Sequence, residues 1–379
     1  MERSIVKNLT FSGITILLFL IVLEVGVRLS GYGRSCQGNY GEHSVWACDP
    51  ILYFKLNPLL NVNGGGLNSA GFRTHEFGPK PAGTYRILAL GDSCTFGITT
   101  TTSFQYIQAP YPQRLEELAA KRVGAGKVEV LNAGVPGYNS FLGVMLLRTR
   151  LRRLQPDLVT VRYGWNDHLM SRHVRGQAFH EPGNALLIGI QDLLLRTALY
   201  PSIRRFQLDL DTRRQAAGSA RATSADIPHE WNPDVPLDEY KHNLGRIAEI
   251  VRGRGAEVWF LTSPHAFIID ENRGQYDKFP NAPSAKYLLT FNGIPTFDRL
   301  IEIHESYNAA TREVGAELGV PVIDMDALYR EHSSEHLFGS TDVPHPTQQG
   351  HDLEAEALYA RLVAQGIVKP APSASVTGN

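Results

Sequence analysis

The side chains that could do chemistry in this chain fall in four short motifs. They are Gly91-Asp92-Ser93, Asn132-Ala133-Gly134-Val135-Pro136-Gly137, Gly164-Trp165-Asn166-Asp167 and Asp342-Val343-Pro344-His345. A serine hydroxyl becomes a good nucleophile when an imidazole takes its proton, and a carboxylate orients that imidazole. Glycine backbone N–H groups and an asparagine amide can stabilise the oxyanion that follows. Together the motifs predict an acyl-transfer site.

The elements that must position these motifs can be read from apolar periodicity. The first three motifs each follow a short aliphatic run, as expected of strands buried on both faces. We expect strands over 85–90, 128–131, 158–163, 258–262 and 320–323, with helices over 112–122, 141–154, 240–251, 301–318 and 352–365. This alternation predicts a parallel, doubly wound α/β sheet. The carboxyl ends of its strands would bring the motifs to one rim.

The four motifs resemble those of the SGNH/GDSL hydrolase superfamily over about residues 84–368. The resemblance implies a flavodoxin-like three-layer α/β/α fold with a five-stranded parallel sheet. It also implies that Ser93 is the nucleophile, His345 the general base and then acid, and Asp342 the residue that orients His345. The oxyanion donors would be the backbone N–H groups of Ser93 and Gly137 and the side chain of Asn166. No metal and no organic cofactor is implied.

Several of these residues also have plainer interpretations. Ser93 could be a helix N-cap, a common role for serine after a strand. Asn166 could brace a turn instead of stabilising an oxyanion. Asp92 and Asp167 are better interpreted as turn-bracing residues than as catalytic acids.

The histidines have to be ranked, because the chain contains 13 of them. His345 is favoured as the base because it has an aspartate three residues before it and because the chain order Ser93, Asp342, His345 suits the family that the motifs resemble. His168 and His265 follow two other expected strands and are candidates for substrate contact. Trp165 is a third candidate, with plain packing as the alternative.

A metal site is the other role that histidines suggest. His332 and His336, four residues apart, could share a helix face and bind a metal. No third ligand is evident in the sequence, so a solvated helix face is favoured.

The N-terminal segment is the strongest outlier in composition. Residues 5–29 are mostly apolar and long enough for one bilayer crossing. A retained transmembrane helix is favoured over a cleaved signal peptide, because no A-x-A site follows the apolar run. Cys36 and Cys48 could form a disulfide or remain two thiols. Pairing would favour an extracytoplasmic catalytic domain, periplasmic or extracellular.

The remaining segments suggest a domain order. We expect the anchor over 1–32, a connector over 33–83, the hydrolase domain over 84–368 and a disordered tail over 369–379. An insertion over 169–237 is far longer than an ordinary βα link and is either a lid that shapes the substrate site or a surface loop. Within it, 185–199 should be helical and 213–226 polar and mobile.

Composition and missing motifs narrow the function. The net charge of −1 and the lack of a basic run argue against a nucleic-acid partner. Neither a G-x-S-x-G elbow nor an H-E-x-x-H zinc motif occurs. Three functions stay open: a serine esterase acting on small-molecule or glycan esters at the cell surface, an O-acyltransferase modifying a cell-surface polysaccharide, and a catalytically silent glycan-binding or scaffold protein. The sequence does not predict an oligomeric state.

Overall fold

The structure is a computed structural model. It describes residues 2–33, 44–58, 60, 66–100, 105–169, 184–218, 231–268, 288–289, 292–339 and 342–369. The chain divides into a smaller unit, Met1–Lys55 with Gln177–Ala225, and a larger unit, Leu56–Gly176 with Asp226–Asn379. The larger unit carries all four motifs.

The apolar runs of the larger unit form a five-stranded parallel sheet. Its strands are β3 (Tyr85–Gly91), β6 (Val128–Gly134), β7 (Leu158–Arg162), β8 (Glu257–Leu261) and β9 (Val322–Ile323). They are ordered β6-β3-β7-β8-β9, and each neighbouring pair is parallel. The flavodoxin-like sheet expected from the sequence is confirmed. The last strand is two residues long, shorter than the expected run over 320–323.

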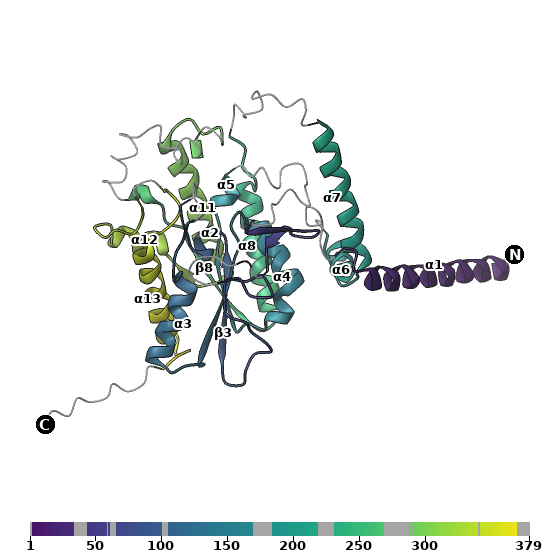
Figure 1. Ribbon diagram of the computed structural model, residues 1–379, viewed down its shortest axis with the longest axis horizontal. Coiled ribbons are helices and arrows are strands. Elements are labelled where there is room, and N and C mark those ends of the chain that lie inside the picture. The colour runs from purple at the N-terminus through teal and green to yellow at the C-terminus, as the bar shows by residue number, and fades with distance from the viewer. Residues whose placement is uncertain are drawn as a thin grey trace. The chain divides into compact units, whose positions relative to one another are not determined.

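Helices cover both faces of this sheet (Figure 1). The helices of one face are α3 (Tyr111–Arg122), α12 (Met325–Glu331) and α13 (Gln348–Ala364). Those of the other face are α4 (Ser140–Leu154), α8 (Leu237–Arg252) and α11 (Phe297–Leu318). Side chains alternate along β3, so that Ile87 and Ala89 join the core cluster with Leu115 of α3 and Leu358 of α13. This arrangement is the expected three-layer fold.

Short elements fill the links between strands and helices. They are β1 (Trp46–Asp49), β2 (Tyr53–Leu56), α2 (Ser93–Phe96), β4 (Ile98–Thr100), β5 (Gln105–Tyr106), α5 (Trp165–His168) and the 3₁₀ turn η2 (Ala266–Ile268). Caps set where the long helices begin. The Asn139 side chain accepts the N–H of Leu142, so α4 starts one residue before the expected boundary.

The described residues of the smaller unit form the helices α1 (Glu2–Ser30), α6 (Ala185–Leu194) and α7 (Leu199–Gly218). The helix expected over 185–199 is confirmed as far as Leu194; it ends there, and α7 begins at Leu199 at an angle of 89° to α6. The carboxylate of Glu24 accepts the N–H groups of Ala198 and Leu199, and thereby caps a new helix at this point. The polar stretch expected to be mobile from 213 is helical as far as Gly218.

Some expectations fall wholly or partly outside the described residues. These include Cys36, residues 170–183 and 219–230 of the expected insertion, and residues 370–379 of the expected tail. Cys48 takes part in a disulfide, and Cys94 is a free, buried thiol. The domain boundaries stay predictions.

Candidate active site

The turn after β3 presents Ser93 at the sheet edge. Asp92 caps the short helix α2, since its carboxylate accepts the Cys94 N–H at 2.8 Å and its carbonyl accepts the Phe96 N–H at 2.9 Å. A Cβ on Gly91 would lie 2.2 Å from the Thr95 hydroxyl oxygen, so only glycine fits at the end of the strand. Asp92 is fully buried, and its carboxylate stabilises the turn through a backbone hydrogen bond, as expected.

The structure brings Ser93, His345 and Asp342 together. His345 Nε2 lies 2.8 Å from Ser93 Oγ, and His345 Nδ1 lies 2.9 Å from Asp342 Oδ1. Because the partner of Nδ1 is a carboxylate, Nδ1 carries the proton and Nε2 accepts from the serine hydroxyl. His345 and Asp342 are buried, whereas Ser93 is partly exposed. This is the geometry of an activated nucleophile.

The loop that carries His345 is fixed on two sides. The His345 backbone N–H donates to Asp342 Oδ1 at 3.0 Å, which closes the loop on itself. The Ala266 N–H donates to the Val343 carbonyl at 2.9 Å, and the Cys94 thiol donates to the Pro344 carbonyl at 3.2 Å. Burial raises the pKa of the Cys94 thiol well above its usual value, so the thiol stays protonated and can donate. The imidazole is thus held before any substrate arrives.

Hydrogen bonds link the turns that carry Gly137 and Asn166, two of the expected oxyanion donors, to each other and to the end of β3. Gly137 has φ +87°, a backbone conformation that favours glycine. The Val135 N–H donates to the Gly91 carbonyl at 3.0 Å, which ties the Gly137 turn to the end of β3. One N–H of the Asn166 amide donates to the Tyr138 carbonyl at 3.0 Å, and this bond sets the direction of the second N–H.

Asp167 braces the turn that holds Asn166. Its carboxylate accepts the backbone N–H groups of Ser140 and Gly164 at 2.9 and 3.0 Å, and the Ser140 hydroxyl at 2.5 Å. Burial raises its pKa to about 7, although these hydrogen bonds pull the value down. The structural interpretation of Asp167 fits these contacts.

The three candidates for substrate contact are buried. Trp165 is 3% exposed and stacks on His304, with ring centroids 3.9 Å apart. His168 Nε2 lies 2.9 Å from His304 Nδ1, and His304 Nε2 lies 2.6 Å from the Ser263 carbonyl. Burial lowers the pKa of His168 well below its usual value and that of His304 to about 3, so both rings are neutral. These contacts favour packing for Trp165 and His168; contact with substrate stays a prediction.

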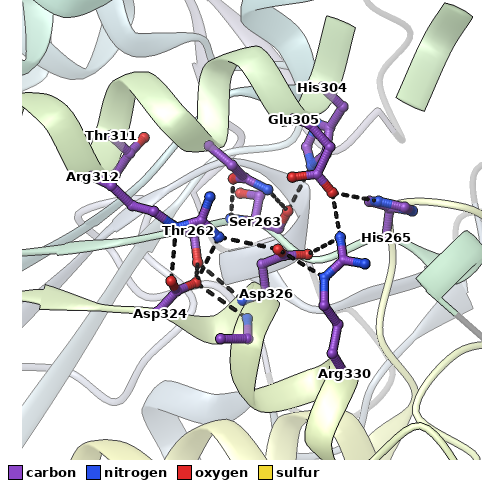
Figure 2. Close-up of polar contacts among 12 residues, drawn as sticks. Thr262, Ser263, His265, His304, Glu305, Thr311, Arg312, Asp324, Asp326 and Arg330 are labelled. Atoms are coloured by element: carbon purple, nitrogen blue, oxygen red, sulfur yellow. Dashed lines mark hydrogen bonds and ion pairs between the residues drawn. The ribbon is translucent and has the colours of Figure 1, made fainter. Parts of the chain in front are cut away.

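His265, the residue before η2, belongs to a network of ion pairs with residues of α11 and α12 (Figure 2). His265 Nε2 lies 3.0 Å from Glu305, which also pairs with Arg330. Arg330 bonds in turn to Asp326 at 3.2 Å. Ligand atoms of His265, Glu305 and Asp326 lie within 4.8 Å of one another, a spacing that a metal ion could bridge. The guanidinium already neutralises both carboxylates, so we interpret the cluster as an ion-pair network.

The other histidine pair does not share a helix. The helix α12 ends at Glu331, and His332 is its C-cap. His332 Nδ1 lies 2.9 Å from the Leu328 carbonyl, and His336 lies beyond the end of the helix. The shared helix face considered for metal binding is therefore not formed.

Sequence reasoning missed an ion pair buried beneath the site. Arg162, at the end of β7, bonds to Glu354 of α13 at 2.7 Å, and both side chains are 0% exposed. The Tyr329 hydroxyl donates to the same carboxylate at 2.8 Å. Burial alone would raise the pKa of Glu354, but Arg162, His351 and Tyr329 lower it below its usual value. The only sign of this ion pair in the sequence is an arginine at the end of an aliphatic strand.

Comparison with known proteins adds a family match. The model described as "GDSL-like Lipase/Acylhydrolase family" matches residues 89–353. No curated protein matches the chain. A crystal structure of a lipase/acylhydrolase from Enterococcus faecalis is 16% identical, covers 76% of this chain and 100% of that chain, and has a TM-score of 0.45. A crystal structure of a catalytic mutant of an acetylxylan esterase from Geobacillus stearothermophilus is 14% identical, and the alignment covers 74% of this chain and 95% of that chain, with a TM-score of 0.42.

Proposed function

Because the chain belongs to the GDSL-like lipase/acylhydrolase family, we propose that it is a serine esterase that works through an acyl-enzyme on Ser93. The observation that carries this proposal is the hydrogen-bonded chain from the Ser93 hydroxyl through the His345 ring to Asp342. Each member lies at the distance that proton transfer needs.

The reaction follows from this chain of contacts. The Ser93 Oγ attacks the ester carbonyl carbon while His345 Nε2 takes the hydroxyl proton. Asp342 stabilises the imidazolium that forms. His345 then gives the proton to the leaving alcohol, and a covalent acyl-Ser93 remains. Water, deprotonated by the same imidazole, releases the acid and restores Ser93.

The oxyanion is stabilised by donors that are fixed in advance. The backbone N–H groups of Ser93 and Gly137 and the second N–H of the Asn166 amide are proposed to bind it. Asn166 is held by the Tyr138 carbonyl and, through the turn, by Asp167. Donors that do not reorganise during the reaction give the larger stabilisation.

We propose further that the enzyme is anchored in a membrane and acts on acyl esters of an exported or cell-surface carbohydrate. The anchor is α1, in which an 18-residue window of the candidate span Lys7–Ser30 has a mean hydropathy of 2.2 and no buried residue. The disulfide at Cys48 supports a catalytic domain outside the cytoplasm.

The esterase proposal is tested by hydrolysis of p-nitrophenyl acetate with the full-length chain in detergent. Ser93→Ala should lose about 10³-fold or more of kcat/KM, because the nucleophile is gone while the donors remain. Ser306→Ala is the matched control, since its hydroxyl bonds only locally to the Ile303 carbonyl on α11. Equal turnover by the parent and Ser93→Ala would show that Ser93 is not the nucleophile.

The substrate and location need separate tests. An acetylated oligosaccharide should release acetate into water; acetyl found instead on an added sugar acceptor would make the protein a transferase. A reporter that is active only in the cytoplasm, fused after Tyr32, should stay silent. A signal from it would reject the proposed topology without affecting the esterase proposal.

A further inference from the structure

The short helix α6 carries an apolar surface that the described part of the chain leaves exposed. Its exposed large side chains are Leu186 (71%), Leu187 (51%), Ile190 (46%), Leu193 (63%) and Leu194 (40%). Gln191, by contrast, is buried. Burying apolar side chains and exposing polar ones is the rule for a surface helix in water, and α6 reverses it.

The first turns of α7 continue this apolar surface. Ile203 is 49% exposed and Phe206 is 56% exposed, three residues apart on one helix face. We call the exposed apolar residues of α6, together with Ile203 and Phe206, the α6–α7 apolar surface.

This surface is attached to the end of the proposed membrane span. The Glu24 carboxylate accepts the N–H groups of Ala198 and Leu199 at 2.8 and 2.9 Å. The Ser202 hydroxyl donates to the Tyr32 carbonyl at 2.8 Å. Figure 1 shows α6 and the start of α7 beside the C-terminal end of α1.

A close backbone approach tightens the same junction. A Cβ on Gly33 would lie 2.8 Å from the Ser202 backbone nitrogen, so the chain leaving α1 packs directly on α7. The Arg205 guanidinium lies 4.2 Å from the centre of the Tyr32 ring, a cation–π distance. The first turns of α7 are therefore held against the end of α1, and α6 precedes them by a link of four residues.

The charges at this junction indicate where the hydrocarbon ends. From Leu9 to Leu23 the large side chains of α1 are apolar and exposed, with no Asp, Glu, Lys or Arg among them. Glu24 and Arg28 follow and form an ion pair at 2.6 Å. Charged groups are costly in hydrocarbon but are stable in the headgroup region, so the membrane boundary lies near Glu24.

The level and length of α6 then determine its environment. It has 10 residues, about 15 Å of helix, which is too short to cross a bilayer. Its C-terminal end lies close to the Glu24 junction, because Ala198, four residues past Leu194, donates its N–H to Glu24. We propose that the α6–α7 apolar surface lies in the lipid–water interface at the end of α1, as a second contact between this chain and the membrane. This inference rests on α1 being a membrane span.

Lipid fits the α6–α7 apolar surface better than a second copy of the chain does, because a bilayer that surrounds α1 is already beside this surface. No residue in the apolar window of α1 is buried. The α6–α7 apolar surface begins at the C-terminal end of α1. A bilayer around α1 therefore reaches α6 without any rearrangement of the smaller unit.

The test places a fluorescent label at three positions of the full-length chain in vesicles that contain brominated phosphatidylcholine. Leu193→Cys reports on α6, Ile16→Cys reports on α1 (60% exposed), and Leu318→Cys reports on an apolar site of the larger unit (39% exposed). The parent chain, treated with the same label, gives the background. Hydrolysis of p-nitrophenyl acetate shows that each variant folds.

Bromine quenches only fluorophores that reach the acyl chains. We expect strong quenching at Ile16→Cys, at least half as much at Leu193→Cys and none at Leu318→Cys. Quenching at Ile16→Cys without quenching at Leu193→Cys would overturn the interfacial contact and leave the span intact. No quenching at Ile16→Cys would reject the span, and the inference with it. Crosslinked Leu193→Cys dimers without quenching would mean that a second copy covers the surface.

Discussion

The larger unit and the helices α1 and α6 of the smaller unit treat apolar side chains in opposite ways. In the larger unit, Ile87, Leu88 and Leu142 are 0% exposed, because helices cover both faces of the sheet. In the smaller unit, Phe11 is 73% exposed and Leu193 is 63% exposed. Among the described residues, the only large exposed hydrophobic side chain outside α1, Tyr32, α6 and α7 is Leu318. The chain-wide composition averages over these two patterns and does not reveal either.

Polar groups show the same contrast. The larger unit buries polar side chains and pairs them, as in the ion pair of Arg162 with Glu354 and the hydrogen bond between His345 and Asp342. In α1 the charges stand at the helix ends, where Glu24 and Arg28 meet the start of α7. Buried charge pairs hold a site rigid, whereas an uncharged exposed helix suits lipid. One unit therefore encloses a polar site within its core, and the other presents apolar helices to its surroundings.

The largest effect should come from the carboxylate of the site. Asp342→Asn keeps the size of the side chain but cannot orient His345 with its proton on Nδ1, so kcat/KM should fall by about 10²- to 10⁴-fold. Asp352→Asn, which alters a partly exposed carboxylate on α13, should leave activity unchanged. The membrane-bound fraction should be the same for both variants. A loss of membrane binding in Asp342→Asn would show that the site of the larger unit and the membrane contact of the smaller unit are not independent.

The buried ion pair should dominate the stability of the larger unit. Glu354→Gln leaves Arg162 as a buried charge without its carboxylate, so the free energy of unfolding should fall by about 3–5 kcal/mol. Glu356→Gln removes a partner of Arg122 that is 48% exposed, and should cost less than about 1 kcal/mol. Urea unfolding of the two variants in detergent measures the difference. Similar losses for both would show that burial does not set the strength of these pairs.

A charge placed in α1 should affect only the smaller unit. Leu18→Arg puts a guanidinium near the middle of the span, which costs about 3 kcal/mol of insertion free energy. We expect more protein in the supernatant after alkaline carbonate extraction, with kcat unchanged in detergent. Leu318→Arg, at the exposed apolar position of the larger unit, should stay in the membrane pellet. Equal extraction of both variants would argue against α1 as the anchor.

A smaller effect should appear in the pH dependence of stability. Since the pKa of Asp167 is raised to about 7, the folded protein binds this proton more tightly than the unfolded chain. Its contribution to the free energy of unfolding therefore falls as pH rises from about 4 to about 7, by at most about 1.4 kcal/mol per pH unit, and is level above that.

Comparison with Asp167→Asn isolates this contribution. The neutral buried His304 gives a slope of opposite sign, but it is present in both proteins and cancels in the difference. The free energy of unfolding of the parent minus that of Asp167→Asn should decrease between pH 5 and pH 7. A difference that grows with pH would mean that the carboxylate is ionised at low pH.

Much of the larger unit could be predicted from its sequence. Aliphatic runs located the five strands, and the rule for parallel sheets placed Ser93 and Asn166 at strand ends. The spacing of Asp342 and His345 suggested that the two residues would meet, and the structure joins them by a hydrogen bond. These signals are local, or they follow from the order of elements along the chain.

Contacts between distant segments could not be predicted in the same way. The break between α6 and α7 depends on Glu24, which lies 174 residues before the Ala198 N–H that it accepts. The partner of Arg162 lies 192 residues away on α13. An arginine in a buried strand indicates that a carboxylate pairs with it, but local periodicity does not predict which carboxylate that is. Helix packing in three dimensions decides that.

The central claim, that Ser93 is the nucleophile, is tested most directly by covalent labelling. A fluorophosphonate should react once per chain, and mass spectrometry of the digested protein should place the adduct on the Ser93 hydroxyl. His345→Ala should react far more slowly, because the base is lost. An adduct on a different residue, or active enzyme that never labels, would contradict the account.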